Sequence, residues 1–367
     1  MKNVRMGVIG VGVMGRGHLA NIAKAKQVEL TAVCDVIAER ANEAATTYAC
    51  AAYTDHQALL RAGVCDAVLI ATPHYAHTTV GIDALKAGLH VLVEKPISVH
   101  KADCERLLAA YKNKRQVFSA MFNQRTDPLY RKIKHMIEQG ELGQLDRITW
   151  IITDWFRTQS YYDAGEWRAT WAGEGGGVLS NQATHNLDLW QWMFGMPDQV
   201  RGFCKIGRKH NIEVEDEVTA YLEYKNGSSG VFITSTGEAP GTNRLEIIGE
   251  RGKLVSENGG LNFIRNEVST NDVLKHSPEK YDRPAVWNIQ MAMPDQGPQH
   301  AGILQNFIDA IISGTKLIAP AVEGIRAVEL GNAILYSSDT GKTVELPLNA
   351  QAYERMLKKK IKESRIK

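Results

Sequence analysis

The stretch GVIGVGVMGRGH, residues 7–18, decides the fold of the first half of the chain. It places Gly10, Gly12 and Gly15 in the spacing G-x-G-x-x-G, directly after an apolar run and at the start of a helical pattern. In that context Gly10 allows a tight turn, Gly12 lets a pyrophosphate approach the backbone, and Gly15 lets the helix pack on the strand. The first N–H groups of the helix then face the phosphates. The stretch therefore predicts a dinucleotide-binding turn.

The acidic residue that such a turn requires is Asp35, twenty residues after Gly15 and at the end of LTAVCD. Its carboxylate can accept hydrogen bonds from ribose hydroxyls and would repel a 2′-phosphate. Val36 and Ile37 follow it, and Arg40 is the nearest arginine, which favours NAD over NADP. The alternative is an ordinary glycine turn with a solvated aspartate at a strand end.

The composition is that of an ordinary globular protein. The chain has 367 residues, of which 44% are hydrophobic and 23% are charged, and this length favours two domains. The net charge of +2 does not indicate a nucleic-acid partner. The basic segment LKKKIKESRIK at residues 357–367 is interpreted as the solvated end of a helix.

The cysteines and the apolar runs indicate a reduced, cytoplasmic protein. The five cysteines are odd in number and show no C-x-x-C or Cys/His spacing, so we expect neither a disulfide framework nor a metal site. The N-terminus enters a strand pattern without the features of a signal peptide. No apolar run approaches the ~18 residues of a membrane span, so we expect no membrane contact.

Two patterns divide the chain, and they predict domains at residues 1–123 and 124–367. In the first, apolar runs such as VELTAVCDV and CDAVLIATP alternate with helical stretches such as HTTVGIDALKAG. Strands separated by helices predict an α/β domain with a doubly wound parallel sheet, the Rossmann arrangement. In the second, strand patterns such as DEVTAYLEY, SGVFITSTG and NRLEIIGERGKLVSENG follow one another closely. Strands without intervening helices predict an antiparallel sheet.

Polar side chains follow two further strand patterns of the first domain. The runs ATPHYAH, residues 71–77, and VLVEKP, residues 91–96, each end an apolar strand. Ligands of open α/β sheets bind outside the carboxyl ends of the strands, so both motifs face the expected cofactor crevice. Pro96 cannot continue a central ladder, and it therefore delivers Glu94 and Lys95 to the crevice. For Lys95, the alternative is a surface lysine at a strand end.

A later segment, GGGVLSNQATHNLDL at residues 175–189, holds a histidine with an amide one helical turn before it. Asn181 and His185 are four residues apart. An unperturbed imidazole titrates near ~6.5, so His185 suits a general base without further tuning. Asn181 can orient the ring without adding charge. The alternative is a buried core histidine that the asparagine caps.

In this order and spacing, the four motifs resemble the glucose–fructose oxidoreductase / inositol dehydrogenase / MocA (Gfo/Idh/MocA) family over nearly the whole chain. The resemblance implies an oxidoreductase that binds NAD and oxidises a secondary hydroxyl of a sugar, glycoside or cyclitol. It also implies an α+β second domain with a large open, mostly antiparallel sheet, whose face commonly makes homo-oligomer contacts. Lys95 and His185 match the family's catalytic lysine and histidine. The position of Asn181 is often Asp in the family, which leaves open how proton transfer is divided between His185 and Lys95.

Aromatic and basic residues gather in TDWFRTQSYYDAGEWRATWAGEGGG, residues 153–177. Aromatic rings suit the C–H faces of sugars and planar aglycones, and arginines bind hydroxyls, carboxylates or phosphates. The alternative is a packed loop that supports the cleft between the domains. The runs FNQRTDP at 122–128 and GPQHAG at 297–302 add further polar candidates.

The predicted site collects these motifs. We expect Lys95, His185 and Asn181 to take part in catalysis. The residues expected to bind NAD are Gly10, Gly12, Val13, Met14, Gly15, Asp35, Val36, Thr72, Pro73, His74, His77, Glu94, Lys95, Asn123, Trp167 and Arg168. The residues expected to bind substrate are Lys95, Arg125, Trp155, Arg157, Tyr161, Trp171, Asn181, His185, Asp188 and His300.

Within the family, NQATHNLDLWQWM at residues 181–193 and the Trp-rich segment look similar to bacterial glycoside 3-dehydrogenases. That branch oxidises the glucose C3 hydroxyl of plant glycosides, including C-glycosides such as puerarin, as the first step of deglycosylation. Two other functions stay open. One is net glycoside hydrolysis through transient oxidation by tightly bound NAD, and the other is a nucleotide-bound sugar sensor without turnover. The presence of Lys95 and His185 favours an enzyme.

Overall fold

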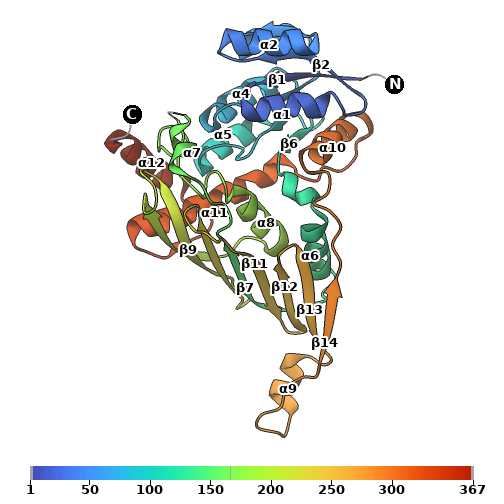
Figure 1. Cartoon of the computed structure of the whole chain (residues 1–367), viewed down its shortest axis with the longest axis vertical. Coiled ribbons are helices and arrows are strands. Elements are labelled where there is room, and N and C mark those ends of the chain that lie inside the picture. Colours follow the sequence, from blue (N-terminus) through green and yellow to red (C-terminus); the bar gives the residue numbers. More distant parts are fainter. Residues whose placement is uncertain (1–2, 166, 365–367) are drawn as a thin grey trace.

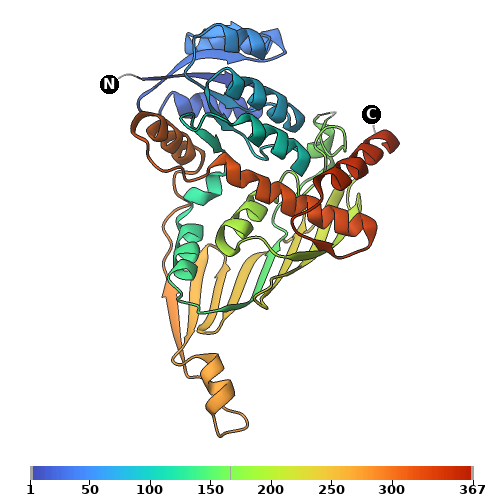
Figure 2. The same ribbon diagram turned by 180° about the vertical axis from the view of Figure 1, so that it is seen from behind.

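The computed structural model describes residues 3–165 and 167–364. Its first sheet has six parallel strands in the order β3-β2-β1-β4-β5-β6 and forms the upper part of the molecule (Figure 1, Figure 2). The predicted doubly wound Rossmann arrangement is therefore confirmed. The strands are β1 (Val4–Ile9), β2 (Val28–Cys34), β3 (Ala51–Tyr53), β4 (Ala67–Ile70), β5 (His90–Val93) and β6 (Phe118–Ala120). The connecting helices are α1 (Val13–Ile22), α2 (Ala38–Tyr48), α3 (His56–Arg61), α4 (His74–Lys86) and α5 (Lys101–Ala110).

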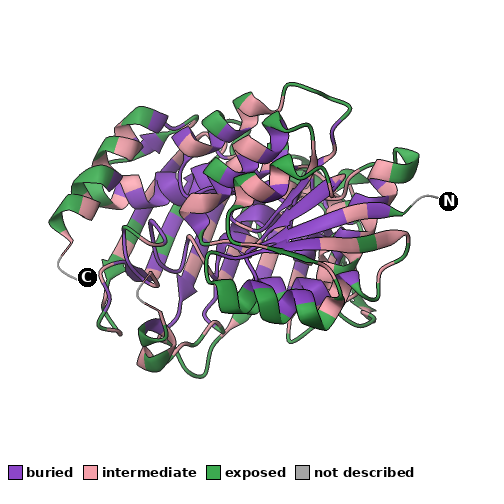
Figure 3. Cartoon of the chain, turned by 90° about the horizontal axis from the view of Figure 1, so that it is seen from above, coloured by how far each residue is buried: buried purple, intermediate pink, exposed green. Residues whose placement is uncertain are grey.

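The central strands of this sheet are buried along their length (Figure 3). All four residues of β4 are buried, as are the last three of β5. Continuous apolar runs of this kind are typical of parallel strands that helices cover on both faces. The strand order reverses between β1 and β4, and the crevice at that point is where open α/β sheets bind ligands.

The second sheet has nine strands in the order β14-β13-β12-β11-β7-β10-β9-β8-β15. The strands are β7 (Leu145–Ile152), β8 (Gln199–Ile206), β9 (Glu215–Glu223), β10 (Ser229–Ser235), β11 (Asn243–Gly249), β12 (Gly252–Glu257), β13 (Gly260–Asn266), β14 (Val286–Met291) and β15 (Val344–Glu345). Only the β7–β10 pair among these strands is parallel, so the mostly antiparallel sheet is confirmed.

Three helices lie between this sheet and the Rossmann domain (Figure 1, Figure 2). They are α6 (Pro128–Glu138), α8 (Thr184–Phe194) and α11 (Ala321–Thr340). Helix α11 packs on β8 and α8 and also on β6 and α5, so it contacts both domains. Exposed apolar side chains such as Phe203, Tyr221 and Trp287 lie on strands of the sheet. That the open face makes a homo-oligomer contact stays a prediction. The remaining helices are η1 (Asn123–Thr126), α7 (Gln159–Asp163), α9 (Thr270–His276), α10 (Gln299–Ser313) and α12 (Ala350–Glu363).

The C-terminal part of the chain returns to the Rossmann domain. Helix α10 packs on α1, and the side-chain oxygen of Gln305 accepts a hydrogen bond from the Lys26 N–H (2.9 Å). Beside β6, the N–H of Ala120 donates to the carbonyl of Ala319 (2.9 Å). The domain boundary at residue 123 stays a prediction, and the segment from residue 299 onward contributes to both domains.

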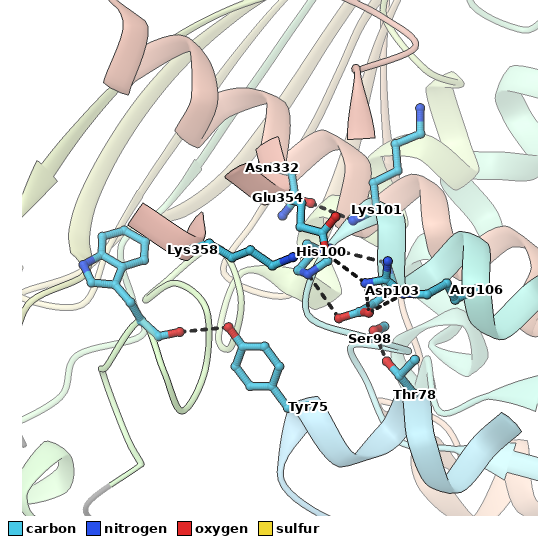
Figure 4. A network of polar contacts seen from close by, with 11 residues as sticks. Tyr75, Thr78, Ser98, His100, Lys101, Asp103, Arg106, Asn332, Glu354 and Lys358 are labelled. Carbon is cyan, nitrogen blue, oxygen red and sulfur yellow. Dashed lines mark hydrogen bonds and ion pairs between the residues drawn. The ribbon is translucent and has the colours of Figure 1, made fainter. Parts of the chain in front are cut away.

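Polar contacts, of which those made by Lys101 are buried, join α5 to the last two helices (Figure 4). Lys101 Nζ donates to Glu329 Oε1 (2.7 Å) on α11 and to the Leu348 carbonyl (2.8 Å). Arg106, one turn further along α5, donates to Glu354 Oε1 (3.1 Å) on α12. A buried ammonium requires such partners, so Lys101 stabilises one arrangement of the two domains.

Two segments differ from the sequence prediction. The helical pattern before Gly195 forms a helix only from Thr184, because residues 180–183 form turns. Gly195 ends this helix with a φ of +78°. The segment between β13 and α10, where no strand or helix is predicted, contains α9 and β14. Among the described residues, no helix combines the length and the apolar content that a membrane crossing requires.

Candidate active site

The glycines of the opening stretch form the turn between β1 and α1. Gly10 has a φ of +91°, and a Cβ there would lie 2.6 Å from the Ala71 carbonyl oxygen. A Cβ at Gly15 would lie 1.9 Å from the Gly10 carbonyl oxygen. A Cβ at Gly12 would meet nothing within 4 Å. Two of the glycines thus permit close packing, and the third leaves the open space that a pyrophosphate needs.

Asp35 follows β2 and lies beside this turn. Its carboxylate accepts hydrogen bonds from the N–H groups of Val11 (2.9 Å) and Ile37 (3.0 Å), which fix its orientation. The side chains of Val13 and Met14, at the start of α1, are exposed. The glycine turn, the oriented carboxylate and the exposed helix start fit the pyrophosphate and adenosine ribose of NAD.

A cleft of about 940 Å³ extends from the glycine turn to the strand-end motifs. Its size is in the usual range for small-molecule sites. Tyr161 and Asn181 of the second domain line the same cleft. The residues predicted to bind NAD that line it are Gly10, Gly12, Val13, Met14, Asp35, Val36, Thr72, Pro73, His74, His77, Glu94, Lys95, Trp167 and Arg168.

Glu94 is a buried carboxylate at the end of β5. Its Oε1 lies 2.7 Å from His18 Nε2 of α1, and its Oε2 accepts the Lys95 N–H (2.9 Å). Burial alone would raise the pKa of Glu94. The hydrogen bond and charge of His18, together with the charge of Lys95, outweigh burial and lower that pKa to about 2. Glu94 therefore stays ionised and attracts the neighbouring ammonium.

The side chain of Lys95 crosses toward the second domain. Its Nζ donates to the backbone carbonyl of Asn181 at 3.1 Å. Burial lowers the pKa of Lys95, and the charges of Glu94 and Glu174 oppose that shift. Burial thus disfavours the charged form of Lys95, and the two carboxylates favour it.

His185 lies in the first turn of α8. Burial, and then the charge of Lys95, lower its pKa well below the usual value. Its Nδ1 is buried without a hydrogen-bond partner in the described structure. The imidazole is therefore neutral at pH 7, which is the state that a general base requires.

The Trp-rich segment forms an aromatic and cationic wall beside Lys95. The guanidinium of Arg168 lies over the rings of Trp167 (4.8 Å) and Tyr161 (4.7 Å). The guanidinium of Arg157 lies over Tyr161 (5.1 Å) and Trp155 (5.7 Å). These contacts with aromatic rings favour defined positions for both guanidinium groups.

Two family models cover most of the chain. The model described as "Oxidoreductase family, NAD-binding Rossmann fold" matches residues 4–122, and the "GFO/IDH/MocA C-terminal domain" model matches residues 130–255. The chain belongs to the Gfo/Idh/MocA family. The predictions of this family and of NAD as the cofactor are confirmed.

Curated relatives and solved structures agree with this assignment. The chain is 26% identical to myo-inositol 2-dehydrogenase of Thermotoga maritima over 354 residues, which are 94% of this chain and 98% of the relative. It is 26% identical to levoglucosan dehydrogenase of Pseudarthrobacter phenanthrenivorans over 395 aligned positions, 95% of this chain and 99% of the relative. A 37% identical match to inositol 2-dehydrogenase of Salmonella typhimurium spans 38% of this chain and 43% of that relative. The WlbA dehydrogenase structure from Bordetella pertussis, in complex with NADH and UDP-GlcNAcA, matches with a TM-score of 0.80 and 26% identity, covering 95% of this chain and 100% of that chain.

In this Gfo/Idh/MocA protein, the predicted pairing of Asn181 with His185 is wrong. Asn181 precedes α8, and its Nδ2 donates to Glu174 Oε1 at 2.6 Å. The expected geometry of one helical turn does not arise, because the chain from residue 180 to 183 forms turns. Asn181 contacts Lys95 instead, through its backbone carbonyl.

The structure places Arg125 and Asp188, both predicted to bind substrate, in a buried ion pair with each other. The Arg125 side chain is 0% exposed and forms two hydrogen bonds with Asp188, at 2.7 and 2.8 Å. Its Nη1 contacts Glu323 Oε2 at 2.5 Å. The motif residues thus form a buried ion pair between η1, α8 and α11, and their polar atoms are already engaged.

Trp171, predicted to bind substrate, is buried away from the cleft. The Lys360 ammonium of α12 lies 5.1 Å from the centre of its ring, and its carbonyl accepts the Tyr75 hydroxyl (2.9 Å). This contact connects α4 to the Trp-rich loop (Figure 4). The side chain is therefore part of the packing between the domains.

Three further predicted residues contact neighbouring segments of the chain. His77 lies 2.8 Å from the carbonyls of Thr72 and Pro96, so it joins the two strand-end loops. His300 packs edge-on against His18, with 5.7 Å between the ring centres. Asn123 donates to Gln299 Oε1 (2.7 Å).

Two residues that were not predicted from the sequence, Glu174 and His18, contact residues of the site. Glu174 is 2% exposed and His18 is 1% exposed. A glutamate among glycines resembles a solvated loop residue, and a histidine on a surface helix resembles a packing residue. The signal that could have identified His18 is its position three residues after Gly15. That spacing places it about one turn into α1, on the side of the helix that faces β5.

Proposed function

We propose that the protein is an NAD-dependent dehydrogenase that oxidises a secondary hydroxyl of a sugar, glycoside or cyclitol to a ketone. One observation carries the proposal. The Lys95 ammonium lies 3.1 Å from the Asn181 carbonyl, in the same cleft as Asp35 and the glycine turn. Relatives named for inositol and levoglucosan support a polyhydroxylated substrate.

The residues of the glycine turn would hold NAD. Gly12 and the N–H groups of Val13 and Met14 suit the pyrophosphate, and the Asp35 carboxylate suits the ribose hydroxyls and disfavours a 2′-phosphate. When bound, NAD accepts a hydride from the carbon that is oxidised.

Lys95 and His185 would divide the handling of the hydroxyl group. The Lys95 ammonium donates to the hydroxyl oxygen and stabilises the negative charge that develops there as the proton leaves. His185 receives that proton, because its ring is neutral and has an unpartnered nitrogen. The C–H electron pair leaves with the hydride, the O–H electrons form the second C–O bond, and the product is a ketone.

Aromatic residues of the Trp-rich segment, of which Tyr161 lines the cleft, support a glycoside as substrate. The side chain of Phe156 is 49% exposed, and Trp155 and Tyr161 lie under Arg157. Such rings offer flat apolar surfaces to a sugar and to a planar aglycone, while the arginines bind hydroxyls. The resemblance to glycoside 3-dehydrogenases points to the C3 hydroxyl of a glucoside, whose oxidation would prepare the aglycone for elimination.

The experiment is a substrate panel with purified protein. The panel contains NAD with myo-inositol, glucose, levoglucosan, methyl glucoside and an aryl glucoside, and NADH formation is followed by absorbance. Preparations that retain NAD are tested again with a keto-sugar acceptor. We expect a keto-sugar product that requires Lys95 and accumulates fastest with the aryl glucoside. Release of free sugar without net NADH would indicate hydrolysis through transient oxidation, and binding without any product would indicate a sensor.

A further inference from the structure

Glu174 is a buried carboxylate in the loop that precedes α8, and it contacts the segment that positions Lys95. The side chain is 2% exposed. Its Oε2 accepts the N–H of Ala169 and its Oε1 accepts Nδ2 of Asn181, both at 2.6 Å. Distances this short are typical of charge-assisted hydrogen bonds. These two N–H donors fix the orientation of the Glu174 carboxylate and connect it to Asn181.

Asn181 connects this carboxylate to the Lys95 ammonium. Its side-chain amide donates to Glu174, and its backbone carbonyl accepts from Lys95 Nζ at 3.1 Å. The same amide lies 3.5 Å from Tyr161 Oη, which accepts a hydrogen bond from Arg168 (2.9 Å). Losing the Glu174 contact would release the amide and displace the carbonyl that holds the ammonium.

Charged groups from several elements face this contact. Burial lowers the pKa of Lys95, and Glu94 and then Glu174 oppose that effect. Burial raises the pKa of Glu174, whereas the Ala169 N–H, Arg168 and Lys95 lower it. The titratable and charged groups that face Glu174 or Lys95 are Glu94, His74, His77, Arg157, Tyr162, Arg168, His185, Glu215 and His300.

We propose that Glu174 is a positioning residue for the reaction, holding Asn181 against Lys95 and supplying a counter-charge to the ammonium across that contact. The inference rests on the proposed function, because it assigns the Lys95 ammonium to the substrate hydroxyl. Glu174 acts through Asn181. The effect of Glu174 is to keep the Lys95 ammonium charged and oriented toward the substrate hydroxyl in a desolvated cleft.

The first variant is Glu174→Gln, which removes the charge and keeps the size of the side chain. The new side-chain oxygen can accept from either Asn181 or the Ala169 N–H, and the new amide nitrogen then faces the other donor. We expect kcat to fall by roughly tenfold to a hundredfold, with NAD affinity within twofold of the parent. The alkaline limb of the pH–rate profile should move toward lower pH, because the ammonium loses its counter-charge.

Glu213→Gln is the matched control. Glu213 accepts the N–H of Trp171 (2.7 Å), so it also orders the Trp-rich loop through a backbone hydrogen bond. It is not among the groups that shift the pKa of Lys95. We expect Glu213→Gln to leave the pH–rate profile unchanged, whatever it costs in thermal stability.

The decisive variant is the double substitution Glu174→Gln/Asn181→Asp. It returns a carboxylate to the other side of the same hydrogen bond, so that the amide at position 174 becomes the donor and the carboxylate at position 181 becomes the acceptor. We expect kcat and the alkaline limb to recover toward the parent. Asn181→Asp alone places two carboxylates in contact, so we expect it to be less active than the double variant.

A readout without substrate separates this inference from the proposed function. The lysines are labelled by reductive methylation with ¹³C-formaldehyde, and the Lys95 signal is identified by its absence in Lys95→Arg. NMR titration should give a lower pKa for Lys95 in Glu174→Gln and a restored pKa in the double variant. An unchanged titration in Glu174→Gln, or a double variant no better than Glu174→Gln, would overturn the inference. If the titration behaves as expected and no panel substrate is oxidised, the proposed function fails while the placement of Glu174 stands.

Discussion

At the scale of single residues, burial has opposite consequences for the two side chains assigned to the hydroxyl proton. Burial lowers the pKa of His185 and of Lys95. For the imidazole this favours the neutral base, whereas for the ammonium it favours loss of the charge that binds the hydroxyl. Glu94 and Glu174 counter that loss at Lys95. Glu94 and Glu174 both raise the pKa of Lys95, whereas of these two carboxylates only Glu94 raises the pKa of His185.

This assignment predicts different pH–rate profiles for His185→Ala and Lys95→Ala. We expect His185→Ala to lower kcat/KM by roughly 10²–10⁴-fold, the usual contribution of a general base, and to abolish the acidic limb. Lys95→Ala should abolish the alkaline limb instead. His185→Ala should bind NAD with the parent affinity, measured by fluorescence titration. An acidic limb that persists in His185→Ala would assign the base to another group.

Glu215 gives a second prediction at this scale, for stability. Burial raises the pKa of Glu215 from an ordinary 4.5 to about 7, although its side chain accepts the N–H groups of Gly177 and Leu179. Between these two pH values the unfolded chain has released a proton that the folded chain keeps, so the free energy of unfolding falls as pH rises. Glu215→Gln keeps an oxygen acceptor and cannot ionise. We expect it to stabilise the protein at pH 8 by on the order of 3 kcal/mol relative to pH 4.5.

Urea denaturation of wild type and Glu215→Gln at pH 4.5 and pH 8 measures this difference. The comparison needs no cofactor or substrate. A stability difference between the two proteins that is the same at both pH values would show that Glu215 ionises normally in the folded state.

At the scale of elements, the start of α1 allows two alanine substitutions with opposite outcomes. A Cβ at Gly15 would lie 1.9 Å from the Gly10 carbonyl oxygen, whereas a Cβ at Gly17, one half-turn further along α1, would meet nothing within 4 Å. Gly15→Ala must displace the turn, so we expect at least a tenfold loss of NAD affinity. Gly17→Ala should raise the free energy of unfolding by about 0.5–1 kcal/mol, since alanine favours the helix.

Isothermal titration with NAD and thermal unfolding of both variants test this pair. Gly17→Ala is the control for the presence of a methyl group on α1. Parent-like NAD affinity in Gly15→Ala would mean that the turn tolerates the displacement and that close packing at Gly15 is not required.

The elements that the sequence predicted are those with a local pattern. The glycine turn, the apolar strands β4 and β5 and the alternating strands β9 and β10 each carry their signal within a few residues. The strand β14, VWNIQM, lacks such a signal because nearly all its residues are exposed, so no alternation of apolar and polar residues marks it. The turn at residues 180–183 was missed because its sequence continues the helical spacing of α8, while the Asn181 side chain bonds to Glu174 instead of the helix.

At the scale of the whole molecule, contacts between residues far apart in the chain could not be predicted from the sequence. Arg125 and Asp188 are 63 positions apart and lie in motifs that otherwise face the cleft. Residue type alone favours a substrate role for both, because exposed arginines and aspartates bind hydroxyls. Only the packing of η1, α8 and α11 shows that the two side chains neutralise each other in the interior. Glu174 could not be predicted for the same reason, because its hydrogen-bond partners come from two other parts of the loop.

The last prediction concerns this buried ion pair, which joins η1, α8 and α11. Arg125→Met leaves the Asp188 carboxylate, 1% exposed, without its charged partner, so we expect a loss of about 3–5 kcal/mol in the free energy of unfolding. Arg125→Met/Asp188→Leu removes both buried charges, while Glu323, whose side chain is 31% exposed, can return to water. The double variant should therefore recover more than half of the loss.

Arg106→Met is the matched control, because Arg106 also joins two helices through carboxylates but is 50% exposed (Figure 4). Water screens such a pair, and we expect a loss below about 1 kcal/mol. Urea denaturation at pH 7 measures all three variants, and NAD titration checks that the glycine turn is intact. If Arg125→Met costs no more than Arg106→Met, the buried ion pair contributes no more to the free energy of unfolding than a surface contact does.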